Sequence, residues 1–178
     1  LYKMEQGLYQ LQPEAVEITR IIKRILVGAE SSRSRKSVRT TLRLQGKQAA
    51  DGDEFWVLGE QLLCHTMLEN LIVNALEASP AKSEVRIDLI RNNVAAIIIH
   101  NQGSVPTHLK SRFFDKYATF GKSHGTGLGT YSARLIAETQ GGSVVMHSSE
   151  EEGTTLTVRL PMPESRSSVL VEEASIGR

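Results

Sequence analysis

The strongest constraint on the fold is a long amphipathic helix predicted over residues 59–78, which Ser79 and Pro80 end. Because residues advance about 100° around a helix, the apolar residues of this segment fall on one continuous arc. A helix with such an arc must bury it against a second layer of structure. The arc consists of Cys64, Met67, Leu68, Leu71, Ile72, Ala75 and Ala78.

The rest of the chain supplies strands that group as neighbours and hairpins. Alternating or continuous apolar residues predict strands over residues 38–44, 55–58, 85–90, 94–100, 143–148 and 154–160. Helices are predicted over residues 16–26, with Pro13 and Glu14 as start signals, and over 109–114 and 128–139, with residues 28–37 as a polar connection. Without strict strand–helix alternation, this order predicts an α+β fold: a two-layer sandwich whose mixed, mostly antiparallel sheet is covered by helices on one face.

Size, charge and cysteine content exclude several classes of protein. A chain of 178 residues suits one domain with a proper core, and its net charge of +1 argues against a surface for nucleic acid. The basic residues between Arg33 and Lys47 lack interleaved aromatic residues, so they predict a solvated face rather than a nucleic-acid site. The apolar runs are too short to span a membrane, and Cys64 is the single cysteine, so we expect no membrane contact by these residues and a cytoplasmic location.

Three polar residues stand at the edge of the apolar arc of the long helix. Asn70, Asn74 and Glu77 fall together there, although asparagine is a mediocre helix former. Such side chains either bond to neighbouring backbone or line a cavity, where amide oxygens can ligate a hard cation such as Mg²⁺. Position on the helix leaves both readings open.

A glycine-rich turn, residues 125–130, directly precedes the helix predicted over 128–139. Glycines allow close backbone approach, and a helix start offers free N–H groups, so the pair suits a phosphate, although many such turns are only flexible connections. A Walker A loop would need glycine where Lys116 stands, and a Rossmann turn would need glycine in place of Thr130. Asn101 ends a buried strand, where its amide oxygen either accepts from an adenine amino group or caps a turn.

Together, in this order, these segments resemble the ATP-binding catalytic domain of bacterial sensor histidine kinases, in the GHKL or Bergerat-fold ATPase superfamily. The resemblance covers residues 1–160. Its motifs are an N box over residues 68–78, a first glycine box over 101–106, an F box over 112–117, a second glycine box over 125–129, and the closing Gly141-Gly142 and Gly153-Thr154-Thr155.

The resemblance implies ATP and Mg²⁺ as cofactors and a role for each matching residue. Asn74 would ligate the metal, Asn70 and Lys122 would act on the phosphates as the catalytic residues, and Asn101 would recognise adenine. The implied ATP-binding set is Asn70, Asn74, Glu77, Ala78, Asn101, Gly103, Val105, Lys122, Gly125, Thr126, Gly127, Leu128, Gly129 and Thr154.

The resemblance also implies a division of the chain and a set of partners. Residues 1–14 would be the end of a dimerisation and phosphotransfer helix with its linker, residues 15–162 the ATP-binding catalytic domain, and residues 163–178 a C-terminal tail or linker. The five histidines lie in or beside the ATP-binding fold, and none is flanked like a phosphoacceptor. The resemblance therefore implies a protein-histidine kinase domain that donates the γ-phosphate of ATP to a histidine on a separate helical domain, within a homodimer that serves a cognate response regulator. It also implies that this domain is either free in the cytoplasm or the cytoplasmic part of a membrane-anchored sensor.

The sequence departs from the family pattern in three features, of which the first two motivate the main alternative. Asn101 replaces the usual aspartate, and the first glycine box is one residue shorter, so adenine binding should be weaker. Glu77 stands at an N-box position where family members often carry another residue, and its carboxylate would either repel the phosphates or help to hold the metal. The main alternative is a degenerate nucleotide-binding module that docks on partners without phosphotransfer. A related GHKL ATPase or an anti-sigma serine kinase is a further alternative, against which residues 1–14 favour the histidine kinase.

Overall fold

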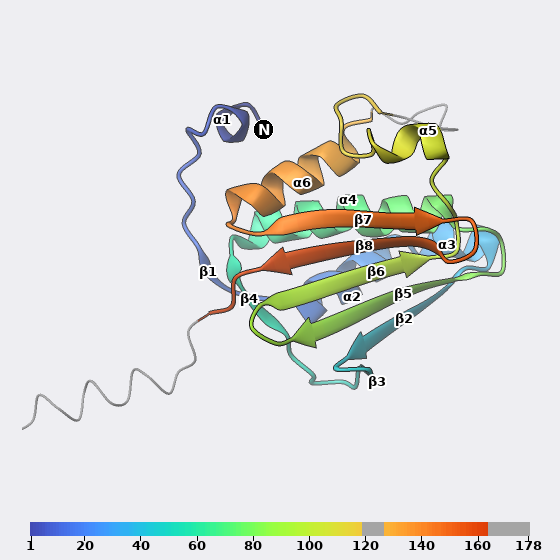
Figure 1. Cartoon of the computed structure of the whole chain (residues 1–178). Helices are drawn as coiled ribbons and strands as arrows, with labels where there is room; N and C mark the ends of the chain where they lie inside the picture. Colours follow the sequence, from blue (N-terminus) through green and yellow to red (C-terminus); the bar gives the residue numbers. More distant parts are fainter. Residues whose placement is uncertain (119–126, 164–178) are drawn as a thin grey trace, which may run out of the picture.

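A six-stranded sheet forms one layer of the molecule in the computed structural model, which describes residues 1–118 and 127–163 (Figure 1). The strand order is β3-β2-β5-β6-β8-β7, in which β2 and β5 are parallel and every other pair is antiparallel. A separate two-stranded sheet pairs β1 with β4. The strands are β1 (Glu14–Glu17), β2 (Arg39–Leu44), β3 (Lys47–Gln48), β4 (Trp56–Gly59), β5 (Glu84–Arg91), β6 (Ala95–Asn101), β7 (Ser143–Ser149) and β8 (Gly153–Leu160).

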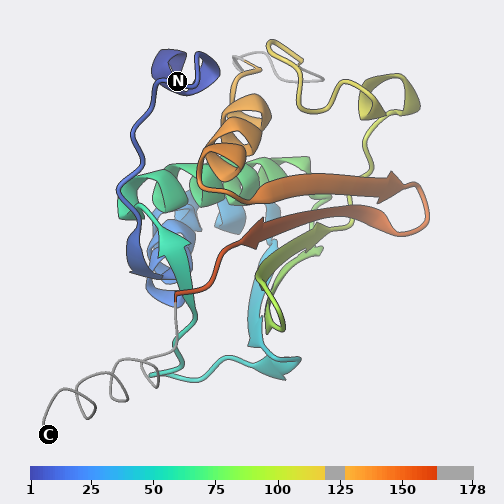
Figure 2. The ribbon, with the colours of Figure 1, turned by 60° about the vertical axis from the view of Figure 1, so that its left-hand side comes forward.

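Helices α2, α4 and α6 make the second layer and cover one face of the sheet (Figures 1 and 2). The described helices are α1 (Tyr2–Glu5), α2 (Ile18–Gly28), α3 (Glu30–Lys36), α4 (Gln61–Ala78), α5 (Thr107–Lys110) and α6 (Gly129–Thr139). This arrangement confirms the predicted two-layer α+β sandwich. None of the helices in the described parts of the chain is both long and apolar enough to cross a membrane.

The core lies between α4 and the middle of the sheet. Leu68, Leu71 and Ile72 of α4 are fully buried, as are Ile97 and Ile99 on the inner face of β6. Burial along β6 alternates residue by residue, which is the period of a strand with one face on the core. The predicted apolar arc is therefore the buried face of α4, except for Ala78, which is exposed at the end of the helix.

Two predictions near the N-terminus are wrong. The helix predicted from residue 16 begins at Ile18, because residues 14–17 pair with β4 as a strand. Its start signal is Glu17, whose carboxylate accepts the backbone N–H groups of Thr19 and Arg20, and not Pro13 with Glu14. Residues 28–37, predicted as a polar connection, contain α3, a short helix without an apolar stripe and therefore without the periodicity that reveals helices in a sequence.

Replacing Glu17 by alanine should lower the free energy of unfolding by about 1–2 kcal/mol, as loss of a helix cap does. The carboxylate also accepts the N–H of Phe55 at 3.2 Å, so it joins α2 to the segment that leads into β4. Burial raises the pKa of Glu17, but the hydrogen bonds from Thr19, Phe55 and Arg20 outweigh it and hold the pKa below its usual value.

Stability that comes from a lowered carboxyl pKa is present at neutral pH and is lost as the pH falls through that pKa. Urea unfolding should therefore separate the Glu17→Ala variant from the parent chain at pH 7 and much less in acid. Glu14→Ala, at an exposed position of the same strand, is the matched control and should stay within about 0.5 kcal/mol of the parent. Equal effects of the two substitutions would contradict the cap.

Candidate functional site

The first half of the candidate site lies where β6 ends. Asn101, the last residue of β6, is buried with 2% of its surface exposed, and it pairs with Thr154 of β8. Its Nδ2 donates to the carbonyl oxygen of Gly103 at 3.4 Å, and the hydroxyl of Thr154 donates to the same oxygen at 2.7 Å. With Nδ2 directed at Gly103, the acceptor atom of the amide is Oδ1. The structure therefore brings together Asn101, which the resemblance assigns to adenine, and Gly103 and Thr154 of the implied ATP-binding set.

A chain of hydrogen bonds extends this cluster to Val105. The backbone N–H of Val105 donates to the hydroxyl oxygen of Ser148 at 2.8 Å, and the Ser148 and Thr154 hydroxyls lie 2.9 Å apart. Because the Thr154 hydroxyl donates to the carbonyl oxygen of Gly103, it can accept from the Ser148 hydroxyl. The hydrogen bonds therefore run in one direction, from the Val105 N–H through Ser148 and Thr154 to Gly103. Ser148 was not predicted, since a serine near the end of a strand gives no sequence signal.

Two glycines let three elements meet at this point. A Cβ on Gly103 would lie closer than 3.0 Å to the carbonyl oxygen of Ala78, at the end of α4. Gly153 has φ +78°, and a Cβ there would come equally close to the carbonyl oxygen of Asn101. Both positions therefore need glycine, and together they hold the end of α4, the turn after β6 and the start of β8 in direct contact.

The second half of the site lies where α6 begins. Gly129 is the first residue of α6, and a Cβ on it would be 3.5 Å from Oδ1 of Asn70 on α4. The cap residue, Leu128, makes no side-chain hydrogen bond to the first turn. The N–H groups of that turn and the positive end of the helix dipole are suited to an anion. The glycine-rich turn and the N-box helix thus meet at one place.

Asn74 lies on α4 between these two halves. From Asn70 to Ala78 the helix rises by about 12 Å, at 1.5 Å per residue. Asn70 and Asn74 are half-buried, and Glu77 and Ala78 are exposed. At the C-terminal end of α4, the Nζ of Lys36 donates to the backbone oxygen of Glu77 at 2.6 Å and to that of Ser79 at 3.3 Å. Lys36 was grouped with the basic residues of a solvated face, and it is exposed, but its Nζ also ties α3 to the end of α4.

The remaining candidates divide between described and undescribed residues. The carbonyl oxygen of Gly127 accepts the N–H of Tyr117 at 3.0 Å, which fixes the chain just before α6. Lys122, Gly125 and Thr126 lie outside the described residues, as does the tail from residue 164.

The residues present fit an adenine nucleotide with a divalent cation. The glycine backbone beside Asn101 allows a base to approach closely. The start of α6 beside Asn70 offers N–H donors for phosphate. The half-buried amide of Asn74 offers an oxygen for a hard cation. Across residues 1–118 and 127–163, there is no cluster of three or more His, Cys, Asp or Glu side chains that could hold a metal ion.

The sheet, the helices on one face and the polar clusters beside the middle and the C-terminal end of α4 define a nucleotide-binding domain of the α+β sandwich class. The family model described as histidine kinase-, DNA gyrase B-, and HSP90-like ATPase matches residues 59–164. The chain belongs to this family. It is an ATPase domain homologous to those of sensor histidine kinases.

A relative matches the chain in sequence, and solved structures match it in fold. The heme sensor protein HssS of Staphylococcus aureus strain Newman is 24% identical over 164 residues, which are 90% of this chain and 34% of that protein. The chain thus spans about a third of this relative. The histidine kinase AdeS of Acinetobacter baumannii has a TM-score of 0.73 at 17% identity and is matched over 92% of this chain and 74% of its own. The catalytic domain of the histidine kinase ThkA has a TM-score of 0.70 at 22% identity, over 84% of this chain and 95% of its own.

Proposed function

We propose that this chain is the ATP·Mg-binding catalytic domain of a two-component sensor histidine kinase, which donates the γ-phosphate of ATP to a histidine on a helical domain outside these 178 residues. The observation that carries the proposal is the meeting of Asn101, Gly103 and Thr154 at the C-terminal end of α4, and of the start of α6 with Asn70 near the middle of α4. Membership of an ATPase family supplies the nucleotide.

Each end of the site has its own task in this proposal. Oδ1 of Asn101 accepts from the adenine amino group, while Gly103 allows the base to approach the backbone. The N–H groups at the start of α6 bind phosphate oxygens, together with Asn70 and Lys122. Asn74 would hold Mg²⁺, which would neutralise part of the charge of the phosphate oxygens. Catalysis is then mainly the positioning and charge stabilisation of the transferred group.

The wider assignment of the chain follows from the same proposal. Residues 1–14 are the end of the helical domain and its linker, residues 15–162 the catalytic domain, and residues 163–178 a tail or linker. The partners are the histidine-bearing domain of the same protein, a second copy in a homodimer, and a cognate response regulator, with the catalytic domain in the cytoplasm. The names of the relatives, which include a heme sensor protein and a histidine kinase, support this setting.

Calorimetric titration of the chain with ATP, with and without Mg²⁺, tests the proposal. Micromolar binding that Mg²⁺ strengthens is the expected result, and phosphate should then pass to an added histidine-bearing helical domain. A folded chain that does not bind ATP would overturn the proposal and favour a degenerate docking module.

Asn101→Ala should weaken ATP binding about 5-fold, because one neutral hydrogen bond contributes about 1 kcal/mol. The loss should be equal for ATP and adenosine and independent of Mg²⁺, since it concerns the base alone. Gln102→Ala, at the exposed neighbouring position, provides the control in the same titration. A loss confined to ATP would place Asn101 at the phosphates and contradict its assigned role.

A further inference from the structure

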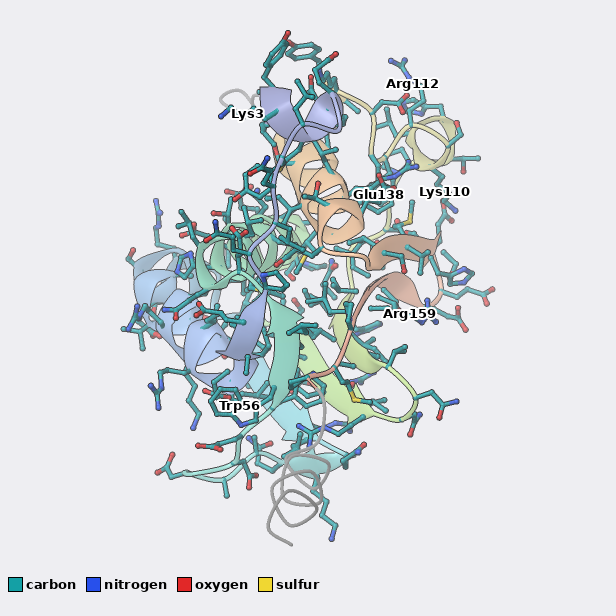
Figure 3. The ribbon with its side chains drawn as sticks, turned by 90° about the vertical axis from the view of Figure 1, so that its left-hand side faces the viewer. Lys3, Trp56, Lys110, Arg112, Glu138 and Arg159 are labelled. Carbon is teal, nitrogen blue, oxygen red and sulfur yellow. The ribbon has the colours of Figure 1, made fainter. Side chains whose placement is uncertain are left out.

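A three-residue cluster joins the N-terminal segment to the start of α6. The carboxylate of Glu5, at the end of α1, lies 2.8 Å from Nζ of Lys116 and accepts the hydroxyl of Tyr131 at 3.0 Å. Nζ of Lys116 also stands 5.1 Å from the centre of the Tyr131 ring, within the range of a cation–π contact. Figure 3 shows α1, marked by Lys3, above α6, marked by Glu138.

The cluster holds the same turn of α6 that faces Asn70. Tyr131 follows Gly129 by two residues, which is about 200° around a helix. Gly129 faces Asn70 of α4, and Tyr131 faces Glu5 on nearly the opposite side. Lys116 directly precedes Tyr117, whose N–H donates to the carbonyl oxygen of Gly127. The first turn of α6 is therefore fixed from one side by α4 and from the other by the N-terminal segment.

Charge keeps this cluster assembled at neutral pH. Its hydrogen bonds to Lys116 and Tyr131 lower the pKa of Glu5, and the bond to Glu5 raises the pKa of Lys116, so both stay ionised. The side chains are 21% and 41% exposed, and ion pairs this open to water contribute little to global stability. The consequence of the cluster is therefore the local placement of α6.

We propose that Glu5 is a positioning residue for the phosphate end of the nucleotide site, acting on the first turn of α6 through Tyr131 and Lys116. The inference rests on the function proposed above. Because residues 1–14 are there assigned to the end of the incoming helical domain, a shift of that segment would pull on the phosphate-binding turn. The N-terminal segment would then set the affinity of the site for the phosphates and leave its affinity for adenine unchanged.

The proposal is tested with Glu5→Gln and with Tyr131→Phe, which removes a single hydroxyl and keeps the ring under Lys116. Calorimetry should show that each variant binds ATP·Mg at least about 3-fold more weakly, as expected for the loss of a modest polar contact. NMR titration should show unchanged binding of adenosine, which occupies the Asn101 end of α4.

Tyr9→Phe is the matched control. The Tyr9 hydroxyl donates to the Glu60 carboxylate at 2.6 Å, so this substitution also removes one hydroxyl bond of the N-terminal segment, but at the start of α4. It should leave ATP binding unchanged. The proposal is overturned if Glu5→Gln and Tyr131→Phe bind ATP like the parent chain, if ATP and adenosine lose affinity equally, or if Tyr9→Phe has the same effect. Absence of ATP binding by the parent chain would instead refute the proposed function.

Discussion

Replacing Asn74 by alanine should remove most of the effect of Mg²⁺ on ATP binding. Asn74 is half-buried on α4, one turn from Asn70 and between the two ends of the site. An amide oxygen is a suitable ligand for Mg²⁺, and loss even of residues that only support a metal ligand costs about 10- to 100-fold in affinity. We therefore expect ATP to bind at least about 10-fold more weakly in the presence of Mg²⁺ and nearly unchanged in its absence.

Asn93→Ala is the matched control for this experiment, because it makes the same chemical change at an exposed position between β5 and β6. Its titration with ATP should match that of the parent chain with and without Mg²⁺. If Asn74→Ala weakened ATP binding equally with and without Mg²⁺, Asn74 would contribute to the shape of the site and not to metal binding.

Much of this arrangement can be predicted because it depends on local periodicity. The apolar arc that includes Leu68 and Leu71 identifies the buried face of α4, and the alternation in β6 identifies the inner face of the sheet. The same arc places Asn70 and Asn74 at the boundary of the core. Gly103 was singled out only through the resemblance, and its close packing against the backbone of Ala78 is known from the structure alone.

Contacts between distant polar residues could not be predicted in the same way. Ser148 bonds to Val105 and Thr154 only because β7 pairs with β8 in one register. Glu5 and Tyr131 are 126 positions apart, and nothing in either neighbourhood identifies the other. Lys36 reaches the end of α4 from a helix that has no apolar periodicity. These contacts depend on how elements pack after they have formed, and that information is not periodic along the chain.

Gly103→Ala should damage both the fold and the nucleotide site. A methyl group at this position would come closer than 3.0 Å to the backbone oxygen of Ala78 and to within 3.0 Å of Nδ2 of Asn101. Backbone cannot rotate away as a side chain can, so the turn after β6 must move from the end of α4. Overpacking of this kind costs about 1–3 kcal/mol, and we expect about 2–3 kcal/mol in urea unfolding. The same movement displaces Asn101 and the carbonyl oxygen that Thr154 contacts, so affinity for ATP and for adenosine should fall by at least about 10-fold.

Gly28→Ala separates this clash from the general effect of replacing a glycine. Gly28 ends α2 at an exposed position, and a Cβ there would meet no atom within 4 Å. Alanine is the better helix former, so this variant should match the parent chain or gain at most about 1 kcal/mol, with unchanged nucleotide binding. A Gly103→Ala variant as stable as Gly28→Ala would mean that α4 and the turn can separate freely. Because Gly103 joins the adenine end of the site to α4, which also carries Asn70 and Asn74, such freedom would leave the two halves of the site without a fixed spacing.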